Sequence, residues 1–181
     1  MIKKKLWVII AARSGSKGIK NKNITNFLGK PLIFHTLNIL KKLNNIVYPL
    51  VSTDSKRIIK YSKKIGFDQS YLRPKRLSLD KSNVVDAVLH ALNWLKKKNM
   101  KFDYVLLLEP TSPNRNIKEL KKNIKKVLHL NLDSSASASK LPFHPSESIY
   151  FKKKKWKFIT KNKKTIFRRQ EFDKNYYFID G

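Results

Sequence analysis

The stretch LWVIIAARSGSKG, residues 6–18, joins a short apolar run to a loop rich in glycine, serine and basic residues. Residues 6–12 are apolar throughout, which is typical of a β-strand buried on both faces of a sheet. A signal peptide also has a basic segment before an apolar run, but this run leads straight into Arg13 and a glycine loop. We therefore predict that residues 6–12 form the first strand of the fold.

Apolar runs and amphipathic segments alternate over the first 140 residues. Further strands are predicted at 45–53, 102–110 and 134–139, and helices at 31–43, 55–66, 82–98 and 116–130. This alternation predicts an α/β domain with a mostly parallel sheet covered by helices on both sides. Ligands in such sheets bind beyond the carboxyl ends of the strands, so the loops after Ala12, Thr53 and Leu108 are the candidate sites.

Single residues within these segments carry local predictions. Pro31 suits the first turn of a helix, and Pro49 indicates an edge strand or a bulge. Ser82 is a candidate helix cap. Val85 is predicted to share the apolar face of its helix with Val88, Leu92 and Leu95.

The tail from residue 141 has a different character. SIYFKKKKWKFIT, residues 148–160, predicts a β-hairpin around a lysine turn, and YYFIDG, residues 176–181, predicts the start of another strand. We therefore divide the chain into an α/β domain, 1–140, and a β-rich appendage, 141–181.

Composition excludes several classes of function. The 181 residues include no Cys, which excludes disulfides, thiolate catalysis and Cys-ligated zinc. No run reaches the roughly 20 apolar residues that span a bilayer, so we expect a soluble cytoplasmic protein without a membrane partner. The formal charge of +29 would indicate a nucleic-acid partner. However, the lysines are spread with Asn and Ile throughout the chain, as in AT-rich coding sequences, so we expect mostly solvated lysines and no nucleic acid.

The loop after the first strand has the chemistry of a phosphate site. Gly15 and Gly18 allow backbone amides to approach an anion, and Arg13, Lys17 and Lys22 offer charged donors. The loop matches neither GxxxxGK[ST] nor GxGxxG. Its spacing alone fits a basic surface loop equally well.

Longer stretches of the sequence decide between a phosphate site and a basic surface loop. AARSGSKGIKNKNI, followed by GKPLIFHTL, resembles the N-terminal signature of the acylneuraminate cytidylyltransferases, the CMP-sialic acid synthetase family. The resemblance continues in the family's order through STDS (52–55), RPKRLSLD (73–80), LLLEPTSPNR (106–115), FHP (143–145) and RRQEF (168–172). Six ordered motifs along nearly the whole chain are specific, whereas any one of them would be weak.

The resemblance implies a Rossmann-like nucleotidyltransferase fold with a β-hairpin appendage that forms a homodimer and reaches into the partner's active site. It implies the reaction of CTP with an acidic nine-carbon sugar, giving the CMP-sugar and pyrophosphate, with Mg²⁺ as cofactor. In-line attack by the sugar hydroxyl on the α-phosphorus needs cations near the phosphoryl oxygens and the departing pyrophosphate.

The resemblance also assigns residues. Arg13 and Lys22 are the expected catalytic residues. The nucleotide is expected to contact Arg13, Ser14, Gly15, Ser16, Lys17, Lys22, Asn23, Arg73 and Ser82, with Arg73 and Ser82 near cytosine and ribose. The sugar acid is expected to contact Glu109, Thr111, Ser112 and Arg169, with Arg169 lent across the dimer.

Other polar and aromatic residues have simpler interpretations. Asp54 is either a helix cap or a contact to nucleotide or metal. His35 and His90 are expected to be packing or surface residues, because no second metal-type ligand stands near them at useful spacing. Trp94 and Trp156 are expected to fill a core or an interface.

The chain departs from the family pattern at three places. Glu109 replaces the usual Gln, which places a potentially repulsive charge near an anionic substrate, and Asp180 replaces the usual Asn of a turn. The family continues past the position of Gly181 into a segment with two aspartates that bind the catalytic metal. We therefore expect metal ligands beyond Gly181, and we interpret the chain as truncated or as a defective gene product.

Alternatives remain open. The sugar acid could instead be legionaminic, pseudaminic or 3-deoxy-octulosonic acid, of which the last fits the first motif least well. A non-catalytic protein that binds CTP or a sugar acid is a second class. A nucleic-acid-binding module, which predicts steep salt dependence, has the weakest support.

Overall fold

The structure is a computed structural model that describes residues 4–15, 18–43, 46–68, 70–145, 148–152, 155–159 and 176–179. The chain divides into two compact units, Met1–Asp133 and Ser134–Gly181. The domain boundary expected after residue 140 falls within the second of these units. None of the helices in the described ranges combines the length and the apolar character needed to cross a bilayer.

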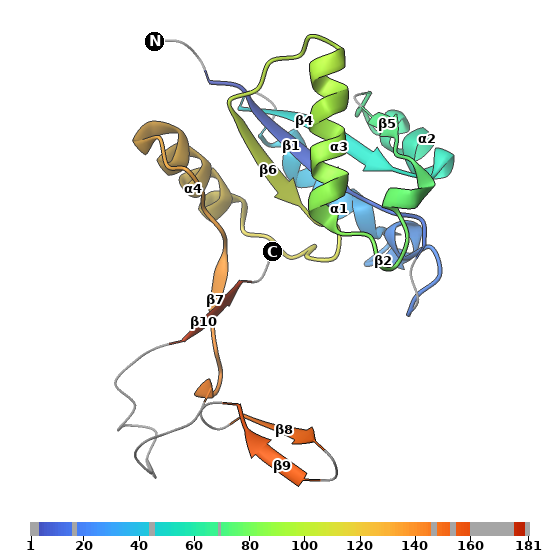
Figure 1. Cartoon of the computed structure of the whole chain (residues 1–181). Helices are drawn as coiled ribbons and strands as arrows, with labels where there is room; N and C mark the ends of the chain where they lie inside the picture. The colour runs from blue at the N-terminus through green and yellow to red at the C-terminus, as the bar shows by residue number, and fades with distance from the viewer. Residues whose placement is uncertain are drawn as a thin grey trace. The chain divides into compact units, whose positions relative to one another are not determined.

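A parallel sheet forms the centre of the first unit (Figure 1). Its described strands are β1 (Leu6–Ala11), β4 (Val47–Thr53), β5 (Ser70–Leu72) and β6 (Tyr104–Leu108), in the order β5-β4-β1-β6. β1 pairs with β4 on one side and with β6 on the other, in parallel on both. The prediction of an α/β fold with a mostly parallel sheet is confirmed.

Helices cover both faces of this sheet. They are α1 (Leu32–Lys41), α2 (Lys56–Lys64), α3 (Val84–Lys97) and α4 (Ile117–Leu130). The connections contain the 3₁₀ turns η1 (Lys22–Ile24) and η2 (Lys75–Leu77) and the short strands β2 (Asn26–Phe27) and β3 (Lys30–Pro31). Figure 1 shows α3 in front of the sheet and α1 behind it.

Alternate residues of β1 enter two separate cores. Leu6, Val8 and Ile10 are buried in a cluster with residues of α1, α2 and α4. Trp7 and Ile9 are buried in a second cluster with residues of α3. The continuous apolar run of the first strand therefore has the expected cause, which is burial on both faces.

Two local predictions about helix starts are wrong. Pro31 precedes α1 in an extended conformation, so it is not in the first turn. The cap of α3 is Asn83, whose side chain accepts a hydrogen bond from the Val85 amide, and Ser82 turns back into the preceding loop. Val85 is 53% exposed and does not share the buried face of α3.

Pro49 lies in β4, an inner strand of the sheet. β5 pairs only with Val51 to Thr53 of that strand, so the stretch around Pro49 has no partner on that side among the described residues. The missing N–H of proline is tolerated there, and the predicted edge character holds locally.

Two antiparallel strand pairs occur among the described residues of the second unit. β8 (Ile149–Lys152) pairs with β9 (Lys155–Phe158), which confirms the predicted hairpin. β7 (Ala138–Lys140) pairs with β10 (Tyr177–Ile179), so only the end of the strand predicted at 134–139 is observed. Trp156 lies in β9, but its side chain is outside the described part of the structure.

Candidate active site

The loops that follow the parallel strands meet at one edge of the sheet. β1 ends at Ala11, and the Ala12 amide donates to the Ser52 carbonyl of the neighbouring strand (3.0 Å). On the other side of β4, the Arg73 amide donates to the Thr53 carbonyl (2.7 Å). The residues just past β1, β4 and β5 are therefore neighbours, as the rule for parallel sheets predicts.

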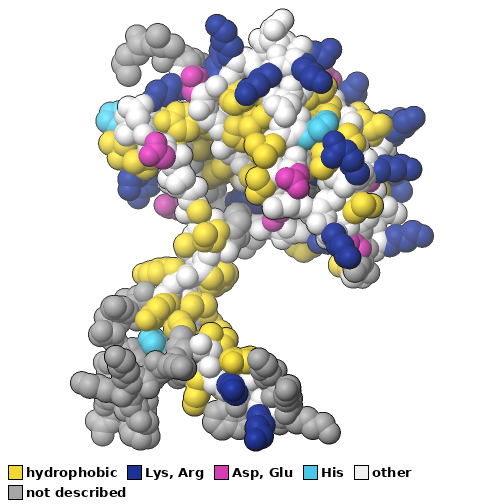
Figure 2. All heavy atoms as spheres, in the orientation of Figure 1, with side chains coloured by type: hydrophobic (Ala, Val, Ile, Leu, Met, Phe, Trp, Pro, Cys, Tyr) yellow, Lys and Arg dark blue, Asp and Glu magenta, His cyan; other side chains and the backbone are white. Residues whose placement is uncertain are grey.

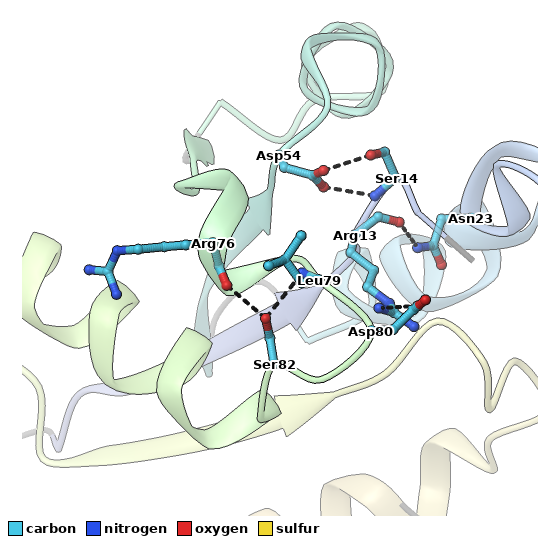
Figure 3. Close-up of polar contacts among 8 residues, drawn as sticks. All are labelled: Arg13, Ser14, Asn23, Asp54, Arg76, Leu79, Asp80 and Ser82. Atoms are coloured by element: carbon cyan, nitrogen blue, oxygen red, sulfur yellow. Dashed lines mark hydrogen bonds and ion pairs between the residues drawn. The ribbon is translucent and has the colours of Figure 1, made fainter. Parts of the chain in front are cut away.

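Asp54 binds the beginning of the loop after β1. Its Oδ1 accepts a hydrogen bond from the Ser14 amide (2.7 Å), and its Oδ2 accepts one from the Ser14 hydroxyl (2.6 Å) (Figure 3). The cap of α2 is the next residue, Ser55, whose hydroxyl accepts from the Ile58 amide. The interpretation of Asp54 as a helix cap is therefore wrong.

Arg13 is held by its backbone and by its side chain. The amide group of Asn23 donates to the Arg13 carbonyl (2.8 Å), and the Arg13 guanidinium lies 3.0 Å from the carboxylate of Asp80 (Figure 3). Asn23 is buried, and its Oδ1 has no hydrogen-bond partner within the described part of the chain. The Asn23 side chain therefore braces the loop through its amide group.

Arg73 is a buried cation, with 4% of its surface exposed. Its Nε donates to the Ser78 hydroxyl (3.0 Å). Burial lowers the pKa of the Arg73 guanidinium, the charge of Asp54 raises it, and the charge of Arg13 lowers it again. A buried guanidinium at this edge suits the planar, polar groups of a base.

Ser82 closes the loop that carries Asp80. Its hydroxyl donates to the Arg76 carbonyl (2.7 Å) and accepts from the Leu79 amide (3.1 Å). Figure 3 shows Asp80 reaching toward Arg13 from this loop, whereas the Arg76 side chain points away. The observed role of Ser82 is thus to shape this loop.

An aromatic stack supports β5, the strand that precedes Arg73. The ring of Tyr71 stacks on His90 and on Trp94, at centroid distances of 5.8 and 5.3 Å. The Tyr71 hydroxyl is hydrogen-bonded to the buried Ser52 (3.2 Å) and lies 3.4 Å from His90 Nδ1. The packing roles expected for His90 and Trp94 are confirmed, as is that of His35, which contacts the rings of Phe27 and Phe34.

The loop after β6 is tied to α1 by Arg115. The Arg115 guanidinium donates to the Glu109 carbonyl (2.6 Å) and to the buried hydroxyl of Thr36 (3.1 Å). Burial lowers the pKa of Arg115, and the negative charge of Glu109 raises it. The Ser112 amide donates back to the Glu109 carbonyl (3.2 Å). Arg115 ends the motif LLLEPTSPNR, but no role for it was predicted from the sequence.

Other predicted site residues have less structural support. Ser16, Lys17 and Arg169 lie outside the described residues, as does Asp180. Lys22 opens η1 and is half-buried, and Thr111 is exposed. A Cβ added to Gly15 would meet no described atom within 4 Å.

Two observations bear on partners. No group of three or more His, Cys, Asp or Glu residues that could hold a metal ion occurs in the described ranges, so these residues alone do not supply a metal site. The visible lysine and arginine side chains are spread over the face of the first unit shown in Figure 2, and they do not gather into one patch. This distribution gives no specific support to a nucleic-acid interface.

Comparisons with known proteins show the family of this chain. Residues 7–180 match the cytidylyltransferase family. A pseudaminic acid cytidylyltransferase of Campylobacter jejuni is 30% identical over 171 residues, covering 93% of this chain and 73% of the relative. The CMP-N,N'-diacetyllegionaminic acid synthase of Legionella pneumophila is 38% identical over 111 residues, covering 61% of this chain and 48% of the relative.

Similarity extends to an N-acylneuraminate cytidylyltransferase of Escherichia coli, 35% identical over 111 residues, which cover 61% of this chain and 25% of that protein. Among solved structures, a CMP:2-keto-3-deoxy-manno-octonic acid synthetase complexed with CTP matches with a TM-score of 0.59 at 17% identity. That match covers 76% of this chain and 52% of the other. At this identity it establishes the Rossmann-like nucleotidyltransferase fold alone.

Proposed function

The chain belongs to the cytidylyltransferase family, and from that premise we propose that it transfers CMP from CTP to an acidic nine-carbon sugar, with release of pyrophosphate. The observation that carries the proposal is the pair of arginines at the carboxyl edge of the sheet. Arg13 begins the basic loop after β1, and Arg73 is buried after β5. These two guanidinium groups follow the strands on either side of β4, and such a site fits an anionic nucleotide.

Each part of the substrate pair has candidate residues. Arg13 and Lys22 would neutralise the triphosphate and the departing pyrophosphate. Arg73, Asn23 and Ser82 are proposed to face the nucleoside. Thr111 and Ser112, with Glu109 and Arg169, are proposed for the sugar acid. The sugar hydroxyl would attack the α-phosphorus in line, forming the new P–O bond as the bond to pyrophosphate breaks.

We also propose Mg²⁺ as a cofactor and a homodimer as the working assembly. When bound, Mg²⁺ supplies charge neutralisation on the triphosphate oxygens. The described residues offer it no cluster of ligands, so we assign it no protein contact.

The second unit exposes many apolar side chains, among them Phe143, Ile149, Tyr150, Phe158 and Phe178, which a second copy would cover in the proposed homodimer.

Calorimetric titration with CTP, with UTP and ATP as controls, tests the nucleotide part of the proposal. We expect clear preference for CTP in Mg²⁺ at moderate salt. Equal or absent binding of all three nucleotides by the folded protein would overturn it.

Pyrophosphate release with a panel of acids tests the reaction. The panel holds N-acetylneuraminic, legionaminic, pseudaminic and 3-deoxy-octulosonic acids, because relatives with each type of name match this chain. We expect release with one of the nine-carbon acids. CTP binding without release from any acid would favour the non-catalytic binding protein instead.

A further inference from the structure

We propose that Asp54 is a positioning residue, which holds the nucleotide loop through Ser14 and balances the charge of Arg73 without contacting nucleotide or metal itself. This inference rests on the proposed function, because the loop and the two arginines are assigned there to CTP.

The first step is the contact with Ser14. Both carboxylate oxygens of Asp54 accept from this one residue, at 2.7 Å from the amide and 2.6 Å from the hydroxyl. Hydrogen bonds to an ionised carboxylate are short and are about twice as strong as neutral ones. Asn23, at the far end of the same loop, donates to the carbonyl of Arg13 at its beginning. Asp54 therefore holds the beginning of the segment 13–23, and Asn23 joins its end to that beginning.

The second step is the position of Asp54 in the sheet. It follows β4, which lies between β1 and β5, so Asp54 stands between the residues that follow those two strands. Arg13 follows one and Arg73 the other. The two cations disfavour each other, since the charge of Arg13 lowers the pKa of Arg73 and the charge of Asp54 raises it. Without Asp54, the repulsion between Arg13 and Arg73 would not be offset in the protein before a ligand binds.

The third step separates this role from the alternatives. Ser55, and not Asp54, caps α2. A carboxylate facing a triphosphate would repel it, so its removal would tighten CTP binding. A metal ligand would matter only when Mg²⁺ is present. A positioning residue predicts weaker CTP binding on neutralisation, with and without Mg²⁺.

The experiment compares Asp54→Asn, Ser14→Ala and the double variant with the wild type. Asn keeps the shape of Asp and removes its charge. Asp68→Asn is the matched control, because Asp68 is exposed and precedes β5, at the opposite edge of the sheet. CTP affinity is measured by calorimetry with and without Mg²⁺, and hydrogen exchange of the segment 12–25 is measured without nucleotide.

We expect Asp54→Asn to weaken CTP binding about tenfold or more, since a charged hydrogen-bonding partner is lost. The double variant should bind no worse than Asp54→Asn, because both changes break the same contact. Exchange of segment 12–25 should quicken in both single variants, and Asp68→Asn should behave as the wild type.

The inference would be overturned if Asp54→Asn bound CTP as tightly as the wild type or more tightly. It would also be overturned if CTP binding were weakened only in the presence of Mg²⁺. Unchanged exchange of segment 12–25 would also overturn it, because the loop would then not depend on Asp54. Failure of the wild type to bind CTP would overturn the proposed function alone, and the exchange measurement would still decide whether Asp54 holds the loop. Ser14→Ala provides that test if Asp54→Asn does not fold.

Discussion

The guanidinium Nη1 of Arg13 lies 3.0 Å from the Oδ1 of Asp80. Their side chains are 36% and 40% exposed, and pairs this exposed contribute about 0–1 kcal/mol. Asp80 therefore pairs with the cation that we assign to the triphosphate, and this ion pair contributes little to the stability of the fold. Binding of CTP would replace one anion by another on the same guanidinium.

Neutralising Asp80 is expected to help the triphosphate. We predict that Asp80→Asn binds CTP up to about fivefold more tightly, because the competing pair is weak. CMP should gain less, since it lacks the pyrophosphate that Arg13 is proposed to hold. Calorimetry with both nucleotides measures the difference, with Asp68→Asn as control. Equal gains for CTP and CMP would argue that Arg13 does not hold the pyrophosphate part.

Arg115 should stabilise the fold through the loop after β6. Arg115→Ala leaves the Thr36 hydroxyl and the Glu109 carbonyl without this donor. We expect a loss of about 1.5–3 kcal/mol in the free energy of unfolding, the range for hydrogen bonds to charged groups. Urea denaturation measures it. Arg57→Ala, on the exposed side of α2, should change little, and an equal loss in both variants would contradict this role.

Much of the fold was predictable because its signals are local. The strand at 6–12 is apolar at every position, and burial of alternate residues in two cores explains why. The edge where Ser14, Asp54 and Arg73 meet followed from the parallel arrangement alone.

Contacts that depend on tertiary structure were not predictable. Ser82 and Asn83 are adjacent and both suit a cap, so only the path of the chain into α3 decides between them. Thr36 and Arg115 meet from positions 79 residues apart, and nothing in their local sequence pairs them. The bond between Asp54 and Ser14 likewise needs β1 and β4 to be side by side.

His90 is expected to make stability depend on pH. Burial lowers the pKa of His90, and the charges of Arg76, Lys97 and Arg73 lower it further. In the unfolded chain this pKa is about 6.5, so between that value and the lower folded value the unfolded state binds more protons. The contribution of His90 to stability is therefore complete above about pH 6.5 and is lost as the pH falls toward its folded pKa.

Urea denaturation at several pH values between about 5 and 7.5 measures this loss. His90→Gln should flatten the slope below about pH 6.5. His129→Gln is the control, because His129 is exposed near the end of α4, and this variant should keep the slope. A slope that His90→Gln leaves unchanged would assign the pH dependence to other groups.

Leu37 tests whether α1 supports the edge of the sheet that carries the site. Its side chain is fully buried in the cluster that includes Val8 and Ile10 of β1, and the neighbouring Thr36 receives Arg115. Leu37→Ala should cost about 2–5 kcal/mol, because truncation leaves a cavity between helix and sheet. Leu130→Ala removes the same atoms from a side chain that is 52% exposed, and it should cost far less. Similar losses in the two variants, measured by urea denaturation, would mean that α1 does not pack on β1 as described.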